Sequence, residues 1–310
     1  MLLKAFKVIA LVLTTFICLA AIYLWTPDKS KAELEKIYGS SNNSYVSTLG
    51  VNIHYQDTGP SKNPIPILFL HGFGASLQTW DTWAESLSEE YRVISVDLPG
   101  FGLTGEDPSG IYTDERTVEV LEAFLKALQI PQVVLVGNSM GGKFAWQFAA
   151  RYPYQVAKLV LISPDGYASP GIEYGKKSEV PAVANLYKYF FSKTFLVMNL
   201  EPAYADPKTL NDALVNRYYD LMLAPGVRGA ILARMQQTSL QDPVPSLSSI
   251  NTPTLLIWGE KDAFIPITNS NDYLKVMPNV KRVSLPNIGH LPQEEQPTLG
   301  LAALKEFLKQ

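Results

Sequence analysis

The chain has 310 residues, enough for one large domain with an insertion or for two small domains. Lysine and arginine together number 26 and aspartate and glutamate 29, so no excess of positive charge favours nucleic acid as a partner. The single cysteine, Cys18, excludes an intramolecular disulfide.

The chain begins with a strongly apolar segment. Val8 to Trp25 spans 18 residues without a charged side chain, and at about 1.5 Å per residue such a helix is roughly 27 Å long, close to a bilayer core. Residues 1–27 are therefore predicted to form a transmembrane signal anchor, followed by a linker over residues 28–44. Lys4 and Lys7 predict a cytoplasmic N-terminus and an extracytoplasmic remainder. A cleaved signal peptide and secretion is the alternative, which the bulky residues at 23–25 disfavour.

Short apolar runs then alternate with helical patterns. Two strands meeting at Gly50 come first, followed by strands near residues 65–70 and 92–97 with a helical stretch between them. A helix over Thr113–Gln129 precedes strands near 133–137 and 158–163, and further strands near 254–259 and 281–286 lead to a final helix near 298–308. This alternation predicts an α/β domain over residues 45–310, with a mostly parallel, doubly wound sheet.

One region breaks the alternation. About ninety residues separate the sixth strand from the seventh, far more than a simple crossover needs. They include a dense aromatic stretch, residues 185–200, and a second helical stretch near 212–223. Residues 165–250 are therefore predicted to form a helical cap inserted after the sixth strand.

The sequence Gly137-Asn138-Ser139-Met140-Gly141 lies between a predicted strand and a predicted helix. In a turn of this kind the serine has a strained backbone, so its neighbours two positions away must be small. The turn lifts the Ser139 hydroxyl clear of the sheet and puts the Met140 N–H at the first turn of a helix, where it favours an oxyanion. We interpret Ser139 as a nucleophile. A glycine-rich turn without chemistry is the alternative interpretation.

A serine nucleophile needs a base, and the chain has three histidines. His290 follows the last strand in a loop at its carboxyl end and is the predicted base. His54 lies inside a predicted strand and is interpreted as structural. His71 begins the sequence His-Gly-Phe-Gly, and we interpret it as shaping a turn that directs the Phe73 N–H at the oxyanion.

The acid that orients the histidine should also follow a strand directly. Asp262 meets this condition and is the predicted acid. Asp165, at the end of an earlier strand, is the rival, and Glu260 is a third candidate. Asp97 is interpreted as a structural turn residue. The order Ser139, Asp262, His290 is the order described for α/β-hydrolases.

From about Tyr45 to Leu308 the sequence resembles an α/β-hydrolase of the serine esterase and lipase kind, close to monoacylglycerol lipases. The resemblance rests on five motifs in order: HGFG, DLPGFG, GNSMGG, WGEKDAFIP and GHLPQEEQP. It implies a triad of Ser139, Asp262 and His290, with an oxyanion hole made by the N–H groups of Phe73 and Met140. A serine nucleophile disfavours the dehalogenase and epoxide hydrolase branches, which have aspartate there. No metal-binding pattern is present, and no cofactor is expected.

The predicted function is a serine hydrolase that cleaves carboxylic esters with an apolar acyl chain through an acyl-enzyme. The aromatic cap and the membrane segment favour a lipid-derived ester such as a monoacylglycerol, although the cap aromatics Tyr187, Phe190, Phe191 and Phe195 can equally serve to pack the cap onto the core. The expected partners are a small-molecule ester and the membrane.

Two alternatives remain. GNSMGG also resembles the serine turn of hydrolases that break carbon–carbon bonds in ring-cleavage products, but Ala75-Ser76 and Leu291 depart from that subfamily. Proline-directed aminopeptidases and cofactor-free haloperoxidases use the same triad and are minor options. The other alternative is a catalytically silent protein of this fold that binds a lipid or a partner.

Overall fold

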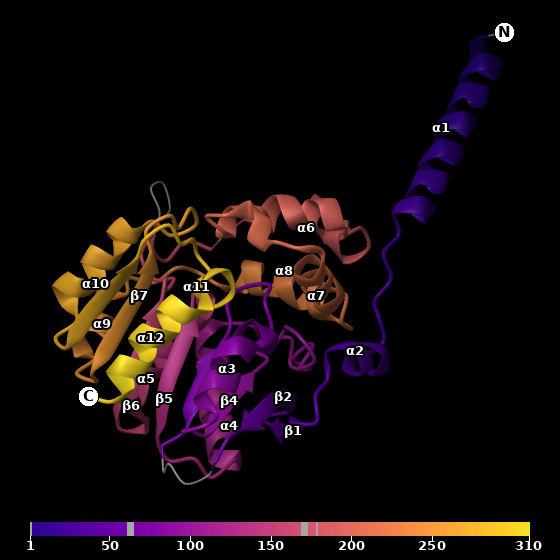
Figure 1. Cartoon of the computed structure of the whole chain (residues 1–310). Coiled ribbons are helices and arrows are strands. Elements are labelled where there is room, and N and C mark those ends of the chain that lie inside the picture. The colour runs from indigo at the N-terminus through magenta and orange to yellow at the C-terminus, as the bar shows by residue number, and fades with distance from the viewer. Residues whose placement is uncertain (1, 61–64, 169–172, 178) are drawn as a thin grey trace.

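The computed structural model describes residues 2–60, 65–168, 173–177 and 179–310. Residue 1 of the predicted anchor and residues 169–172 and 178 of the predicted cap lie outside these ranges. One eight-stranded sheet organises the chain (Figure 1). Its strands are β1 (Asn43–Thr48), β2 (Val51–Thr58), β3 (Ile67–Leu70), β4 (Val93–Val96), β5 (Val133–Asn138), β6 (Val156–Ile162), β7 (Thr254–Gly259) and β8 (Val280–Leu285).

The strand order is β1-β2-β4-β3-β5-β6-β7-β8. The pairs β1–β2 and β2–β4 are antiparallel, and all later pairs are parallel. β3, β4, β5 and β7 are buried along their whole length, as expected for strands covered on both faces. The predicted mostly parallel sheet is confirmed.

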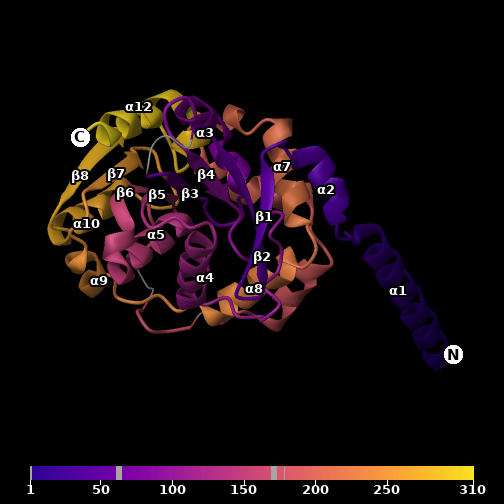
Figure 2. The same cartoon turned by 90° about the horizontal axis from the view of Figure 1, so that it is seen from below.

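Helices cover both faces of the sheet, as Figure 2 shows. One face carries α3 (Asp81–Leu87), α11 (Pro292–Glu295) and α12 (Pro297–Leu308). The other carries α4 (Asp114–Ala127), α5 (Met140–Arg151), α9 (Val244–Ser249) and α10 (Ser270–Val276). Each face has its own apolar cluster: Trp80 and Trp83 are fully buried on the first, Phe144 and Phe148 on the second. Helix α4 begins at its cap Thr113, whose side chain accepts a hydrogen bond from the Arg116 N–H.

Between β6 and β7 lies the cap, which contains η3 (Ala182–Lys188), α6 (Lys193–Leu200), α7 (Asp212–Met222) and α8 (Val227–Gln237). Figure 1 shows α6, α7 and α8 grouped at one end of the sheet. Helix α9 was expected in the cap but packs against α5 beside the sheet, because its Leu247 is fully buried in the core cluster there. The remaining short 3-10 helices are η1 (Leu77–Trp80), η2 (Pro153–Gln155), η4 (Glu201–Ala203), η5 (Pro207–Thr209) and η6 (Ile267–Asn269).

The N-terminal segment forms α1 (Leu2–Leu24), which extends away from the body (Figure 1). Among the described residues, Lys4–Leu24 is the one helical segment long and apolar enough to cross a membrane, a test that a signal sequence also passes. The range expected to be a linker instead contains helix α2 (Lys31–Tyr38). Ser30 caps α2 by accepting from the Glu33 N–H at 3.2 Å, and Leu34 is fully buried in the core, so this range has both a start signal and an anchor for a helix.

Candidate active site

Ser139 lies at the sharp turn between β5 and α5. Its backbone φ of 53° is in the left-handed region that side chains other than glycine rarely adopt. A Cβ atom on Gly137 would lie 2.3 Å from the Gly141 carbonyl oxygen, and one on Gly141 would lie 2.3 Å from the Leu70 carbonyl oxygen. The two glycines are therefore needed because β5, α5 and β3 approach one another too closely for a side chain.

We expect Gly137→Ala to lower the stability of the protein by about 1–3 kcal/mol or more, because backbone atoms must shift to admit the methyl group. Gly229→Ala is the matched control. Gly229 lies inside α8, and its Cβ atom would come no closer than 3.9 Å to another atom, so alanine there should be neutral or stabilising by roughly 0.5–1 kcal/mol. Thermal unfolding of the full chain in detergent measures both. Equal melting temperatures for the two variants would contradict this account of the turn.

His290 and Asp262 form a buried pair. The His290 Nδ1 atom lies 2.7 Å from Asp262 Oδ2. The other carboxylate oxygen, Oδ1, accepts the N–H groups of Phe264 at 2.9 Å and Ile265 at 2.8 Å. The backbone of the loop after β7 thus holds the carboxylate, and the carboxylate holds one ring nitrogen. His290 Nε2 remains as the ring atom that can accept a proton from a nucleophile.

The side chain of Asn138 links the serine turn to the histidine loop. Its Nδ2 atom donates to the carbonyl oxygens of Ile162 and His290, both at 3.1 Å. No direct hydrogen bond joins the Ser139 hydroxyl to the His290 ring among the described residues. Long serine–histidine distances are common in structures without substrate, and they shorten when the substrate binds. The two loops are therefore held beside each other through Asn138.

A second histidine–aspartate pair lies elsewhere in the core. His54 Nδ1 is 2.7 Å from Asp97 Oδ2, and both side chains are fully buried. Asp97 also accepts the N–H groups of Leu77 and Leu103, each at 2.8 Å. Burial raises the pKa of Asp97, but these hydrogen bonds and His54 hold it below its ordinary value. This pair fastens β2 to the turns around β4, and neither side chain lines the cavity at Ser139 that is described below.

His71 is fixed in one tautomer by its partners. The Leu98 N–H donates to His71 Nε2 at 3.0 Å, so Nδ1 carries the hydrogen and donates to the Gly72 carbonyl oxygen at 2.7 Å. Burial lowers the pKa of His71 and keeps the ring neutral. The histidine therefore shapes the turn that precedes Phe73. Neither the Phe73 N–H nor the Met140 N–H has a hydrogen-bond partner within the described ranges.

Ser139 opens into a cavity of about 360 Å³. Its apolar wall consists of five side chains: Phe73, Met140, Met235, Leu240 and Ile265. Charged side chains line another part of the cavity. Lys143 pairs with Asp114 at 3.1 Å and with Asp165 at 3.5 Å. Asp165, the rival acid, thus contacts a lysine and not His290, and Glu260 is exposed to solvent. No group of metal-ligating side chains occurs among the described residues.

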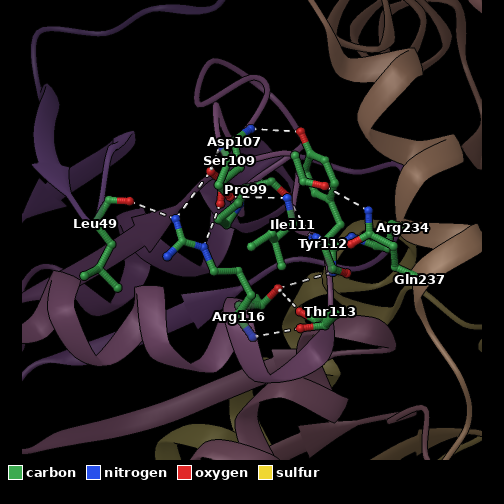
Figure 3. Close-up of polar contacts among 12 residues, drawn as sticks. Leu49, Pro99, Asp107, Ser109, Ile111, Tyr112, Thr113, Arg116, Arg234 and Gln237 are labelled. Atoms are coloured by element: carbon green, nitrogen blue, oxygen red, sulfur yellow. Dashed lines mark hydrogen bonds and ion pairs between the residues drawn. The ribbon is translucent and has the colours of Figure 1, made fainter.

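Arg234, on cap helix α8, was not singled out from the sequence because no motif surrounds it. It is buried at the cavity wall and donates to the carbonyl oxygens of Pro99 at 2.9 Å and Tyr112 at 3.3 Å (Figure 3). Burial lowers the pKa of Arg234 to about 10. Gln237, one helical turn later, accepts the Tyr112 N–H at 2.7 Å. These two side chains fasten the cap to the loop after β4.

A second fastening joins the cap to the histidine loop. Glu294, four residues after His290, accepts the Tyr204 hydroxyl at 2.6 Å and pairs with Arg217 of α7. The His290 N–H itself donates to the Ala203 carbonyl oxygen at 2.7 Å. The cap is therefore bound directly to the loop that carries His290, so cap position and histidine position are coupled.

Comparison with known proteins identifies the family. The model of the α/β hydrolase fold family matches residues 65–297. Hydrolase YugF of Bacillus subtilis (strain 168), itself uncharacterized, is 29% identical over 266 residues, covering 84% of this chain and 95% of that protein. The 2-hydroxymuconate semialdehyde hydrolase of Pseudomonas putida is 31% identical over 270 residues, covering 83% of this chain and 90% of that protein.

Among solved structures, that of a bacterial membrane phospholipase A has a TM-score of 0.73 and 26% identity, and covers 99% of this chain and 97% of that one. Lipases, an epoxide hydrolase and meta-cleavage product hydrolases also match. These relatives share a hydrolytic function but differ in substrate. The chain belongs to the α/β hydrolase fold family.

Proposed function

We propose that the protein is a serine hydrolase that cleaves carboxylic esters through an acyl-enzyme. The observation that carries the proposal is the left-handed backbone of Ser139, which directs this residue into a cavity also lined by Phe73 and Met140. In this mechanism Ser139 attacks the ester carbonyl and His290 takes its proton, while Asp262 orients the ring. The Phe73 and Met140 N–H groups receive the oxyanion. His290 then protonates the leaving alcohol, and water repeats the steps on the acyl-enzyme.

The five apolar side chains of the cavity support an apolar acyl group. The apolar helix α1 and the likeness to a membrane phospholipase A support a lipid-derived ester, of the monoacylglycerol kind, as the substrate. We further propose that α1 is an uncleaved anchor with an extracytoplasmic catalytic domain. Trp25 and Thr26, which directly follow α1, contact the cap, so cleavage there would remove contacts of the folded domain.

A series of p-nitrophenyl esters from acetate to palmitate, assayed with the full chain in detergent, tests the proposal. Turnover should rise from acetate to octanoate or decanoate, because each added methylene buries more surface against the apolar wall. The Ser139→Ala variant provides the blank. Folded protein without serine-dependent turnover on any ester would contradict the esterase proposal.

The second candidate is hydrolysis of carbon–carbon bonds in ring-cleavage products. It is favoured by the 31% identity to 2-hydroxymuconate semialdehyde hydrolase and by the meta-cleavage product hydrolases among the matches. Lys143 and Arg234 at the cavity wall offer cations for an anionic substrate, but each is already satisfied by protein oxygens. A dienoate ring-cleavage product, followed by loss of its visible absorbance, distinguishes the two candidates. Turnover of this product in the absence of esterase activity would favour the second.

A further inference from the structure

The cap exposes several large apolar side chains, each about half or more open to solvent. Exposed fractions are 68% for Val183 and 69% for Met198. We use the name cap face for these two side chains together with Leu186, Tyr189 and Phe195, which all come from η3, α6 or the short segment between them. Helix α6 is apolar around most of its circumference yet buries only Leu196. Helices of that composition are normally covered on every side, so the cap face indicates a further contact surface.

The end of α1 is fixed to the same part of the cap. The Thr26 N–H donates to the Tyr189 carbonyl oxygen at 2.8 Å, and the Thr26 hydroxyl donates to the Phe191 carbonyl oxygen at 3.1 Å. The Trp25 ring stacks on the Tyr189 ring, with centroids 5.3 Å apart. Figure 1 shows α1 leaving the body beside the cap, with α6 on the side of the molecule toward which α1 extends.

A buried charge strengthens this connection. Arg228 of α8 donates to the Thr26 carbonyl oxygen and pairs with Asp28, both at 2.7 Å, and its side chain is only 4% exposed. Lys29 pairs with Asp220 of α7 at 3.1 Å. Four of the five residues from Trp25 to Lys29 thus contact the cap, and a free tether would not need these contacts. The contacts hold the cap against the point where α1 would enter a bilayer.

The composition of the cap face suits a lipid interface. Residues 181–200 contain five aromatic side chains and two lysines, Lys188 and Lys193, but no acidic residue. Aromatic rings and lysines are the residues preferred at the level of lipid headgroups, and lysines are attracted to anionic lipids. Between the end of α1 and the cap is an open hollow of about 630 Å³, lined by Trp25, Lys29 and Lys193 among others. The hollow adjoins the end of α1, because Tyr23 and Leu24 also line it.

We propose that the cap face docks into the bilayer interface and forms a second membrane contact in addition to α1. The occupant of the face is lipid, because the segment fixed to the cap is the one that would span the membrane. Docking places the cap, and with it the cavity walls Arg234 and Met235, beside the lipid that would supply the substrate. The proposal rests on the proposed anchoring by α1 and is independent of the esterase activity.

Spin labels on single cysteines test the proposal in the full chain reconstituted into vesicles of phosphatidylcholine and phosphatidylglycerol. Cys18 is replaced by serine, and cysteine is introduced at Val183, Met198, Val12 of α1 or Leu299 of α12. Leu299 is the matched control, because it is 45% exposed and lies outside the cap. We expect the labels at Val183 and Met198 to resemble the label at Val12, so that each collides more often with oxygen than with a water-soluble nickel chelate. The label at Leu299 should show the reverse.

Each departure from this pattern overturns the proposal in a distinguishable way. If Val12 is in lipid but both cap labels collide freely with the nickel chelate, the cap does not dock. If both reagents are excluded from the cap labels and the exclusion is lost on dilution with lipid, a second copy of the chain covers the face. If Val12 itself is in water, the anchoring by α1 is wrong and the docking falls with it. None of these readings depends on enzymatic turnover.

Discussion

Replacing Ser139 with alanine is expected to lower kcat for the best ester substrate by roughly 10⁶-fold, because the variant has no group that can form the acyl-enzyme. The substitution removes one oxygen atom from a residue at the strained turn and leaves Gly137 and Gly141 in place, so the melting temperature should change little. The measurement is kcat for the chosen p-nitrophenyl ester, with thermal unfolding as the check on folding.

A fluorophosphonate probe, which reacts with activated serines, provides an independent measurement. We expect labelling of the wild-type chain and none of Ser139→Ala. Labelling that persists in the variant would remove Ser139 from the nucleophile role. Failure of the folded wild-type chain to react at all would instead favour the catalytically silent, lipid-binding alternative.

Asp262→Asn is expected to lower kcat by about 10⁴-fold. The amide can replace one oxygen that accepts the Phe264 and Ile265 N–H groups, but it cannot stabilise the positively charged ring of His290 or hold Nδ1 in its protonated form. Asp165→Asn is the matched control, since it makes the same chemical change in the rival acid. It should leave kcat within a few fold of wild type, because Asp165 contacts Lys143.

The comparison of the two variants decides between the acids. A large loss for Asp165→Asn together with near-normal kcat for Asp262→Asn would reverse the assignment. Measuring the pH dependence of kcat/KM separates a role in catalysis from a role in folding. Loss of the paired carboxylate should change the shape of this pH profile, because Asp262 bonds directly to the His290 ring, whereas simple destabilisation would lower activity without reshaping the profile.

Most of the predictions about the site depended on short sequence patterns. The turn at Ser139 depends on contacts among Gly137, Gly141 and a neighbouring strand, and the glycines signal it in the sequence. The positions of the strands could also be predicted from the sequence, because buried parallel strands are continuous apolar runs. Asp262 and His290 could be chosen because each follows such a strand, and parallel strands bring their carboxyl ends to one edge of the sheet.

Other features depend on contacts between segments distant in the chain. The range 28–44 is polar on average and was taken for a linker, yet one side chain, Leu34, inserts into the core and makes it helical. Helix α9 was assigned to the cap because it precedes β7 in sequence, and packing against α5 determines its true place. Arg234 and Glu294 have no local motif, so their roles in fastening the cap emerge only from their partners 77 to 135 residues away.

The sequence by itself determined the family, the order of strands and helices and the residues proposed for catalysis, because these depend on short-range patterns of glycine, apolar runs and strand ends. Only the tertiary structure decided which aspartate meets His290, how the cap is attached, and that the end of α1 is bound to it. These features depend on contacts between side chains that are far apart in the sequence. The free energies of burial and of charge pairing decide which contact forms, although the local sequence is compatible with several.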